Sequence, residues 1–259
     1  MASGRDPYEG FSFRELFDWK RRLARETPFL ESTLARAPER SVADLGCGNG
    51  EHARLFASLG FRTVGVDRSP AMLEQARDHE DPPRLTFVEG DLLTLADSLV
   101  GRFGAAVCLG NTLPHVETEA DLEIAFRNVA SFLVPGGIFL AQLLNYERIL
   151  SQGIRSMPVT IVPSSDGWTV LLRLLQPEEG GIIRFCPTVL RWTPDREPAV
   201  EVLESRSLEH RAWGAPEIAG ALAAAGFSEP LFFGDMTGGP YEPASSVDLV
   251  VVARAGGAR

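Results

Sequence analysis

Short apolar runs of strand length alternate with amphipathic segments through the first 150 residues of the chain. The runs are residues 42–45, 63–66, 85–88, 105–109 and 138–144, and helical spacing of apolar residues marks 51–59 and 121–133. An unbroken apolar run fits a strand that is covered on both faces. Strands that alternate with helices in this way predict an α/β fold with a largely parallel sheet.

Helical patterns also precede the first strand. Residues 11–37 carry apolar side chains at helical spacing, and Pro28 predicts the start of a second helix after Thr27, because proline is tolerated in a first turn. These helices either cover an edge of the sheet or form a lid over a site; Trp19 and Arg25 would then face the ligand. Further along, Ser69 followed by proline predicts a capped helix start.

The pattern changes after residue 153. Four β-rich runs (159–162, 168–175, 182–192 and 200–209) are separated by Gly-containing hairpin signals, which predicts an antiparallel insertion. A helix at 215–225 and strands at 231–234 and 247–253, the last two as an antiparallel hairpin, then complete the first sheet. The predicted parts are N-terminal helices with an α/β core (1–150), the insertion (151–212), which walls a ligand pocket, and the rest of the core (213–259).

The stretch SVADLGCGNGE, residues 41–51, joins the first predicted strand to the next helix. Its glycines permit positive φ and a close approach of a ligand to the backbone. A dinucleotide-binding G-x-G-x-x-G would need glycine where Glu51 stands, and no Gly-Lys-Ser/Thr of a P-loop follows. Neither phosphate-binding pattern is therefore present.

The remaining pattern, D-x-G-x-G-x-G from Asp44 to Gly50, resembles the first motif of class I S-adenosylmethionine-dependent methyltransferases. The resemblance implies a Rossmann-like seven-stranded sheet with helices on both faces, here with a small antiparallel β insertion. It also implies S-adenosyl-L-methionine as cofactor and S-adenosyl-L-homocysteine as product. The cofactor has no phosphate, and its positive sulfonium and aminoacyl group suit an acidic loop.

Two further acids follow predicted strands. Asp67 stands about twenty residues after the glycine loop, where a carboxylate can accept two hydrogen bonds from the ribose hydroxyls; an exposed strand-end acid is the alternative. Asp91 matches the methyltransferase position that hydrogen-bonds the adenine amino group, and a solvated turn acid is its alternative. The predicted cofactor-binding residues are Asp44, Gly46, Cys47, Gly48, Asn49, Gly50, Asp67, Arg68, Asp91, Leu92, Leu109, Gly110 and Asn111.

The string CLGNTLPHV, followed by VPGGIFL and then Asn145 and Tyr146, is similar to glycine N-methyltransferase and to small-molecule N-methyltransferases that act on amino acids and amino sugars. The resemblance is best over residues 41–150. It implies that Asn111 orients an amine and that His115 accepts a proton or contacts the cofactor carboxylate; His115 in a structural role is the alternative. The predicted substrate-binding residues are Trp19, Asn145, Tyr146 and Tyr241.

One departure from this family changes the expected substrate. Glycine N-methyltransferases have an arginine immediately before the Asn-Tyr pair, where it clamps the substrate carboxylate, but this chain has Leu144. A paired guanidinium–carboxylate contact is strong in a desolvated site. Free glycine is therefore disfavoured, and either a less anionic amine or a carboxylate held by Arg148, Arg155 or Arg173 is expected.

Composition excludes several other classes. The net charge is -10 and the sequence has no long basic tract, which disfavours nucleic acid as a partner. Three cysteines without a C-x-x-C predict neither disulfides nor a zinc site, and they favour a reducing, cytoplasmic setting. No apolar run is long enough to cross a membrane. Asn111 and Thr112 stand where metal-dependent O-methylation needs carboxylates, so no metal is expected.

The favoured function is methyl transfer from S-adenosylmethionine to an amine nitrogen of a small molecule. Two alternatives stay open: O- or C-methylation of a small molecule, and a catalytically silent protein that binds the cofactor and assists a partner. A homo-oligomer is compatible with the sequence, which does not identify the acceptor.

Overall fold

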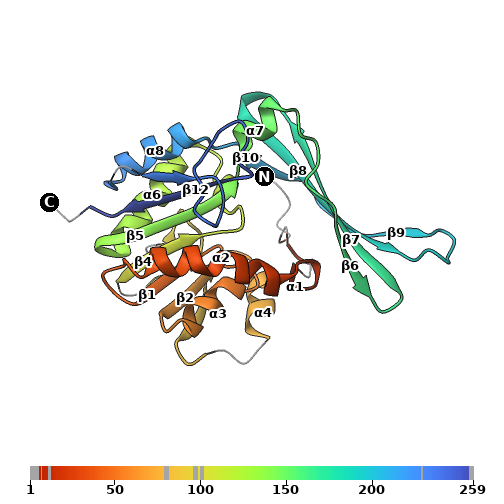
Figure 1. The fold of residues 1–259 in the computed structure, drawn as a ribbon, viewed down its shortest axis with the longest axis horizontal. Helices are drawn as coiled ribbons and strands as arrows, with labels where there is room; N and C mark the ends of the chain where they lie inside the picture. Colours follow the sequence, from red (N-terminus) through yellow and green to blue (C-terminus); the bar gives the residue numbers. More distant parts are fainter. Residues whose placement is uncertain are drawn as a thin grey trace.

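The computed structural model describes residues 6, 8–10, 13–78, 82–95, 99, 102–228 and 230–256. Figure 1 shows a twisted sheet with helices on both faces, from which a second, antiparallel sheet projects. Phe11 and Ser12 of the predicted N-terminal helical segment lie outside the described residues. No helix among the described residues has the length and apolar character needed to span a membrane.

The first sheet has seven strands in the order β11-β12-β5-β4-β1-β2-β3. The strands are β1 Ser41–Leu45, β2 Arg62–Asp67, β3 Leu85–Glu89, β4 Phe103–Cys108, β5 Leu133–Leu144, β11 Leu231–Phe233 and β12 Asp248–Arg254. Neighbours from β3 through β5 are parallel, whereas β12 is antiparallel to both β5 and β11. The predicted α/β class, the seven-stranded sheet and its C-terminal hairpin are confirmed.

Helices cover both faces because successive strand residues point to opposite sides of the sheet. The helices are α1 Phe13–Leu16, α2 Trp19–Leu34, α3 Glu51–Ser58, α4 Pro70–Arg77, α6 Glu119–Phe132, α7 Tyr146–Ser151 and α8 Ala215–Ala224. In β4, Val107 packs with α2 and α3 side chains, whereas Cys108 packs in the cluster that holds those of α6 and α8. As predicted, Ser69 caps α4 and a proline occupies its first turn.

One predicted helix start and one predicted strand start were wrong. Pro28 starts no new helix but lies inside α2, which begins after the capping residue Asp18. The buried side chains Leu30 and Leu34 pack on the sheet beyond Pro28, so one continuous helix buries the apolar face. Helix α6 ends at Phe132, within one residue of the prediction, but β5 begins at Leu133 and not at residue 138, because the chain is already extended and paired with β4 there.

The second sheet is the predicted antiparallel insertion, with strand order β10-β8-β7-β6 and β9 also paired with β8. The strands are β6 Thr160–Ser164, β7 Gly167–Pro177, β8 Ile182–Trp192, β9 Val200–Ser205 and β10 Leu208–Arg211. The run predicted as one strand at 200–209 is two strands. Pro187 of β8 lies opposite the break, and it has no N–H to continue the ladder.

Helix α1 and the start of α2 connect the two sheets. Leu16 packs with Leu171 of β7 and Val189 of β8, and Phe17 lies against this cluster. The inner face of the insertion therefore lies beside the N-terminal part of α2. This contact brings the insertion to the edge of the first sheet where the parallel strands end.

Gly104 provides a test of how closely β4 lies against the loop before β1. A Cβ at this position would overlap the backbone carbonyl of Glu39, whereas a Cβ at the exposed helical Gly220 would meet nothing within 4 Å. We expect Gly104→Ala to destabilise the protein by about 3 kcal/mol or more. Gly220→Ala, the control, should stabilise it by about 0.5–1 kcal/mol. Urea unfolding of both variants measures the difference, and equal midpoints would contradict the close packing.

Candidate functional site

A cavity of about 1190 Å³ lies at the carboxyl ends of β1, β2 and β4. Side chains of α2, the loops after these strands and the insertion surround it. Open α/β sheets bind ligands at this edge, because the strand ends and helix starts meet there. The cavity is therefore the candidate active site.

The glycine loop forms the floor of the cavity. Gly46, Gly48 and Gly50 all have positive φ, at 69°, 54° and 79°. The amides of Gly46 and Cys47 donate to the carbonyl of Val66, at 2.7 and 2.9 Å, which ties the loop to β2. A Cβ on Gly46 would overlap the side chain of Thr112, so the close approach of the two loops requires glycine.

Asp44, at the end of β1, is a buried acid with an incomplete set of partners. Its carboxylate accepts a hydrogen bond from the backbone N–H of Ala53, but the oxygen Oδ2 is buried without a partner. Burial, together with the nearby charge of Asp67, raises the pKa of Asp44 to about 7. An unsatisfied buried carboxylate oxygen on a cavity wall suits a positively charged or hydrogen-bond-donating ligand.

Asp67 and Asp91 line the same cavity. Asp67 accepts hydrogen bonds from the amides of Gly48, at 2.8 Å, and Ser69, at 2.9 Å. Burial raises the pKa of Asp67, although these two bonds oppose the change. Asp91 is more exposed and accepts from the amide of Leu93 at 2.9 Å. The three predicted strand-end acids therefore converge on one space.

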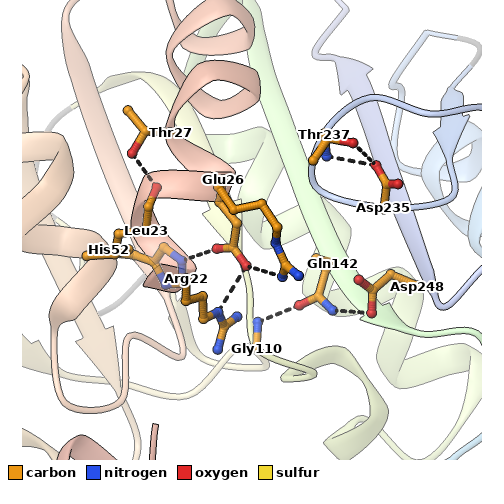
Figure 2. A network of polar contacts seen from close by, with 11 residues as sticks. Arg22, Leu23, Glu26, Thr27, His52, Gly110, Gln142, Asp235, Thr237 and Asp248 are labelled. Atoms are coloured by element: carbon orange, nitrogen blue, oxygen red, sulfur yellow. Dashed lines mark hydrogen bonds and ion pairs between the residues drawn. The ribbon is translucent and has the colours of Figure 1, made fainter. Parts of the chain in front are cut away.

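A charged cluster joins α2 to α3 beside the glycine loop (Figure 2). Buried Glu26 lies 2.8 Å from Nε2 of His52, 3.0 Å from Arg22 and 3.5 Å from Arg25. Burial alone would raise the pKa of Glu26, but the His52 hydrogen bond and the Arg22 charge hold it at about 2. Burial lowers the pKa of His52, whose ring also meets the edge of Trp19. Both arginines line the cavity, and they also interact electrostatically with Asp248, another lining residue.

A glutamine inside β5 connects three parts of the cavity rim. Oε1 of Gln142 accepts from the amide of Gly110, and its Nε2 donates to Asp248 of β12, both at 2.9 Å (Figure 2). Burial raises the pKa of Asp248. Through Gln142 of β5, these bonds connect the loop after β4 to the start of β12.

Asn111 begins a hydrogen-bond chain that reaches the insertion. It has a positive φ of 71°, which is uncommon for a residue other than glycine. Its Oδ1 accepts from the amide of Leu144 at 3.0 Å, which leaves Nδ2 to donate to the Tyr146 hydroxyl at 3.0 Å. That hydroxyl can then donate to Nδ1 of His210, 3.2 Å away. The arrangement leaves the ring hydrogen of His210 on Nε2, a buried atom without a partner.

His115 and His210 lie together at one end of the cavity. Their ring centroids are 4.6 Å apart, and Nε2 of His115 lies 2.5 Å from the hydroxyl of Tyr8. Burial lowers the pKa of His115, and it lowers that of His210 to about 4. Both imidazoles are therefore neutral near pH 7. A neutral imidazole can accept a proton or donate one hydrogen bond.

The structure brings most of the predicted site residues to the cavity. Those that line it are Trp19, Asp44, Gly46, Cys47, Gly48, Asn49, Asp67, Arg68, Asp91, Leu92, Leu109, Gly110, Asn111 and His115. Gly50, Asn145, Tyr146 and Tyr241 are not among the lining residues. Gly50 precedes α3, and Asn145 caps α7 while its side-chain amide holds the carbonyls of Pro243 and Ser246. Tyr146 reaches the cavity only through its bonds to Asn111 and His210.

Sequence reasoning missed several residues of the cavity. They are Tyr8, Arg22, Glu26, His52, Gln142, Met157, Phe185, His210 and Asp248. Gln142 alone carried a local signal, because it is a polar residue inside an apolar strand run. Glu26 and His52 are 26 residues apart, and no local motif connects them. Within the described ranges, no group of three or more His, Cys, Asp or Glu side chains is arranged to hold a metal ion.

Comparison with known proteins agrees with this geometry. Residues 42–137 match the methyltransferase domain family. The chain is 31% identical over 152 residues to glycine/sarcosine N-methyltransferase of Aphanothece halophytica, covering 57% of each protein. It is 29% identical over 164 residues to human glycine N-methyltransferase, covering 58% of this chain and 56% of the relative. The aligned segment thus spans about half the length of these relatives.

Similar solved structures cover nearly the whole chain. DesVI of Streptomyces venezuelae has a TM-score of 0.73 at 20% identity, covering 96% of this chain and 99% of that one. CalS10 of Micromonospora echinaspora, an amino pentose methyltransferase with S-adenosylmethionine bound, has a TM-score of 0.71 at 22% identity and covers 94% of each chain. The chain therefore carries a methyltransferase domain and has the fold of class I S-adenosylmethionine-dependent methyltransferases.

Proposed function

We propose that this protein transfers a methyl group from S-adenosylmethionine to an amine nitrogen of a small molecule. The observation that carries the proposal is the buried, unpartnered Oδ2 of Asp44, which shares one cavity with Asp67 and the glycine loop. The names of the aligned relatives, which are N-methyltransferases, support the amine acceptor.

The charges around the cavity fit this cofactor. Asp44 offers an acceptor to its positive aminoacyl end, and Asp67 offers carboxylate oxygens to the ribose hydroxyls. Asp91 stands where the adenine would bind. Arg22 and Arg25 line the cavity between Glu26 and Asp248, and their guanidinium groups can donate hydrogen bonds to the cofactor carboxylate. When bound, the cofactor would supply an activated methyl group on a positively charged sulfur.

The protein residues then need to orient the acceptor and exclude water. Orientation can lower a barrier by about 7–11 kcal/mol, provided that the reacting atoms are held firmly. Asn111 is held firmly, since both ends of its amide are bonded and its backbone conformation is set by the loop. His115 is neutral and can hydrogen-bond a neutral amine; because burial holds its pKa well below the ordinary value, it suits an acceptor nitrogen that enters already deprotonated rather than an ammonium group. Phe185, Met157 and Leu144 supply apolar walls.

Calorimetry and a labelled-methyl assay test the function. We expect S-adenosylmethionine and S-adenosylhomocysteine to bind with dissociation constants well below 1 mM. Label from the methyl group should pass to amines in a panel of amines, phenols and carboxylic acids. Transfer only to hydroxyl or carbon acceptors would refute the amine assignment. Tight cofactor binding without transfer to any acceptor would indicate a catalytically silent protein, and no cofactor binding would refute the whole proposal.

Asp67→Asn tests the assignment of the ribose position. The amide keeps the size of the side chain but replaces one acceptor with a donor, so we expect cofactor binding to weaken by about 1–3 kcal/mol. The control is Glu123→Gln on the exposed face of α6, which should leave affinity unchanged. Calorimetry with S-adenosylhomocysteine measures both. An unchanged dissociation constant for Asp67→Asn would show that the ribose binds elsewhere.

Asp44→Asn should improve the stability of the cofactor-free protein while weakening cofactor binding. The folded-state pKa of Asp44, about 7, lies above its ordinary value of 3.8, so ionisation opposes folding. This penalty is absent below about pH 4, grows as the pH rises to about 7 and is then constant. We expect a gain of roughly 2–4 kcal/mol at pH 8 and a smaller gain at pH 5.

Urea unfolding at the two pH values measures this gain, and Asp195→Asn, at an exposed position, is the matched control. Calorimetry on the same variants should show weaker S-adenosylhomocysteine binding for Asp44→Asn only. A destabilised Asp44→Asn protein with normal cofactor affinity would contradict both the buried-charge argument and the cofactor assignment.

A further inference from the structure

Arg173 of β7 is a cavity-lining cation without a counter-ion among the described residues. Its Nη2 donates to the carbonyl of Pro158 at 3.0 Å and approaches Thr160 Oγ1 at 3.5 Å, while its buried Nε has no partner. The guanidinium also lies over the ring of Phe17, at 5.6 Å from its centroid. Burial and the charge of Arg22 lower its pKa. A partly buried cation of this kind is best satisfied by an anion.

Three other arginines that line the cavity each lie close to an acid. Arg22 and Arg25 share Glu26 and also interact electrostatically with Asp248, and we assign them to the cofactor carboxylate. Arg68 lies 3.8 Å from Asp91. Arg173 is thus left with no assigned anion once the cofactor is bound.

The inner face of the insertion connects Arg173 to the acceptor end of the cavity. In the β7–β8 ladder, Arg173 pairs with Pro187 and Leu175 pairs with Phe185, so these side chains share one face. The Phe185 ring stacks on His210 of β10, at 4.8 Å between centroids, and His210 adjoins Asn111. Strands β10 and β7 are two ladder spacings apart, or about 10 Å. Arg173 and His210 are also offset along β8, because Arg173 pairs with Pro187 and His210 pairs with Ile183, a shift of about 13 Å.

A backbone contact holds this face in place. The amide of Met157 donates to the carbonyl of Arg173 at 2.9 Å, which places Met157 beside it on the cavity wall. On the opposite side, the rim carries Leu144, where the glycine N-methyltransferases resembled by the sequence have their carboxylate-binding arginine. A positive charge is therefore absent at the end of β5 and present on the insertion.

We propose that Arg173 is a specificity-determining residue that binds a carboxylate on the amine acceptor. This inference rests on the proposed function. The amine lies near Asn111 and the carboxylate near Arg173, with an apolar body against Phe185 and Met157. Because Arg173 is separated from His210 both across the sheet and along it, acceptors with a spacer between amine and carboxylate fit better than glycine does.

Matched acceptor pairs test the proposal on the protein saturated with S-adenosylhomocysteine. The pairs are 4-(aminomethyl)benzoate with benzylamine, and 6-aminohexanoate with hexylamine, and calorimetry measures the binding of each. We expect each acid to bind at least tenfold tighter than its matched amine. Arg173→Met should reduce this preference to less than twofold without changing the S-adenosylhomocysteine dissociation constant by more than twofold.

Arg155→Met is the control, because Arg155 is an exposed arginine of the same insertion and should retain the preference. Arg173→Gln serves if the methionine variant does not fold, since glutamine can still donate to the Pro158 carbonyl without carrying a charge. The labelled-methyl assay with the same pairs should show the same selectivity in initial rates.

Four results would overturn the proposal. They are a preference that persists in the Arg173 variants, amines that bind the wild type as well as the acids do, no binding of either acid, and a loss of S-adenosylhomocysteine affinity in the Arg173 variants, which would assign the guanidinium to the cofactor. A wild-type protein that fails to bind S-adenosylhomocysteine at all refutes the proposed function itself, and this inference falls with it.

Discussion

A buried carboxylate with one unpaired oxygen has to be held in position by the rest of the fold. Asp44 is the penultimate residue of β1, an interior strand that pairs with β2 on one side and β4 on the other, so its backbone has little freedom to move toward solvent. The neighbouring charge of Asp67 adds to the cost. The apolar clusters on both faces of the sheet supply the stability that offsets this cost, and a ligand with matching charge would relieve it.

The same edge of the sheet sets the position of the arginines. Glu26 lies between α2 and α3 and binds His52, so the helix that precedes the sheet is fixed to the helix that follows the glycine loop. Arg22 and Arg25 project into the cavity from that fixed helix. A shift of α2 would move these two arginines relative to the buried acids at the strand ends, and the Glu26–His52 contact opposes that shift.

Local signals predicted the sheet and the edge of it where the cavity lies. Apolar runs mark the strands, and glycine and acidic residues mark the points where the parallel strands end. Contacts between distant segments were not visible in the sequence. Helix α2 continues past Pro28 because Leu30 and Leu34 pack in the core. The strand predicted at 200–209 is interrupted opposite Pro187 and forms β9 and β10. His210 had no local partner pattern, since its partners Asn111 and Tyr146 lie in the loop after β4 and at the start of α7. The predicted domain boundaries remain predictions.

The cavity has two halves that come from different parts of the chain. Residues 42–137, which match the methyltransferase family, contribute the glycine loop and the three strand-end acids. Met157, Arg173, Phe185 and His210 come from the insertion, beyond that match. Substitutions on the inner face of the insertion can therefore change which acceptor is selected while the acids at the strand ends stay as they are. This separation explains why the family match supports the cofactor more strongly than it supports any particular acceptor.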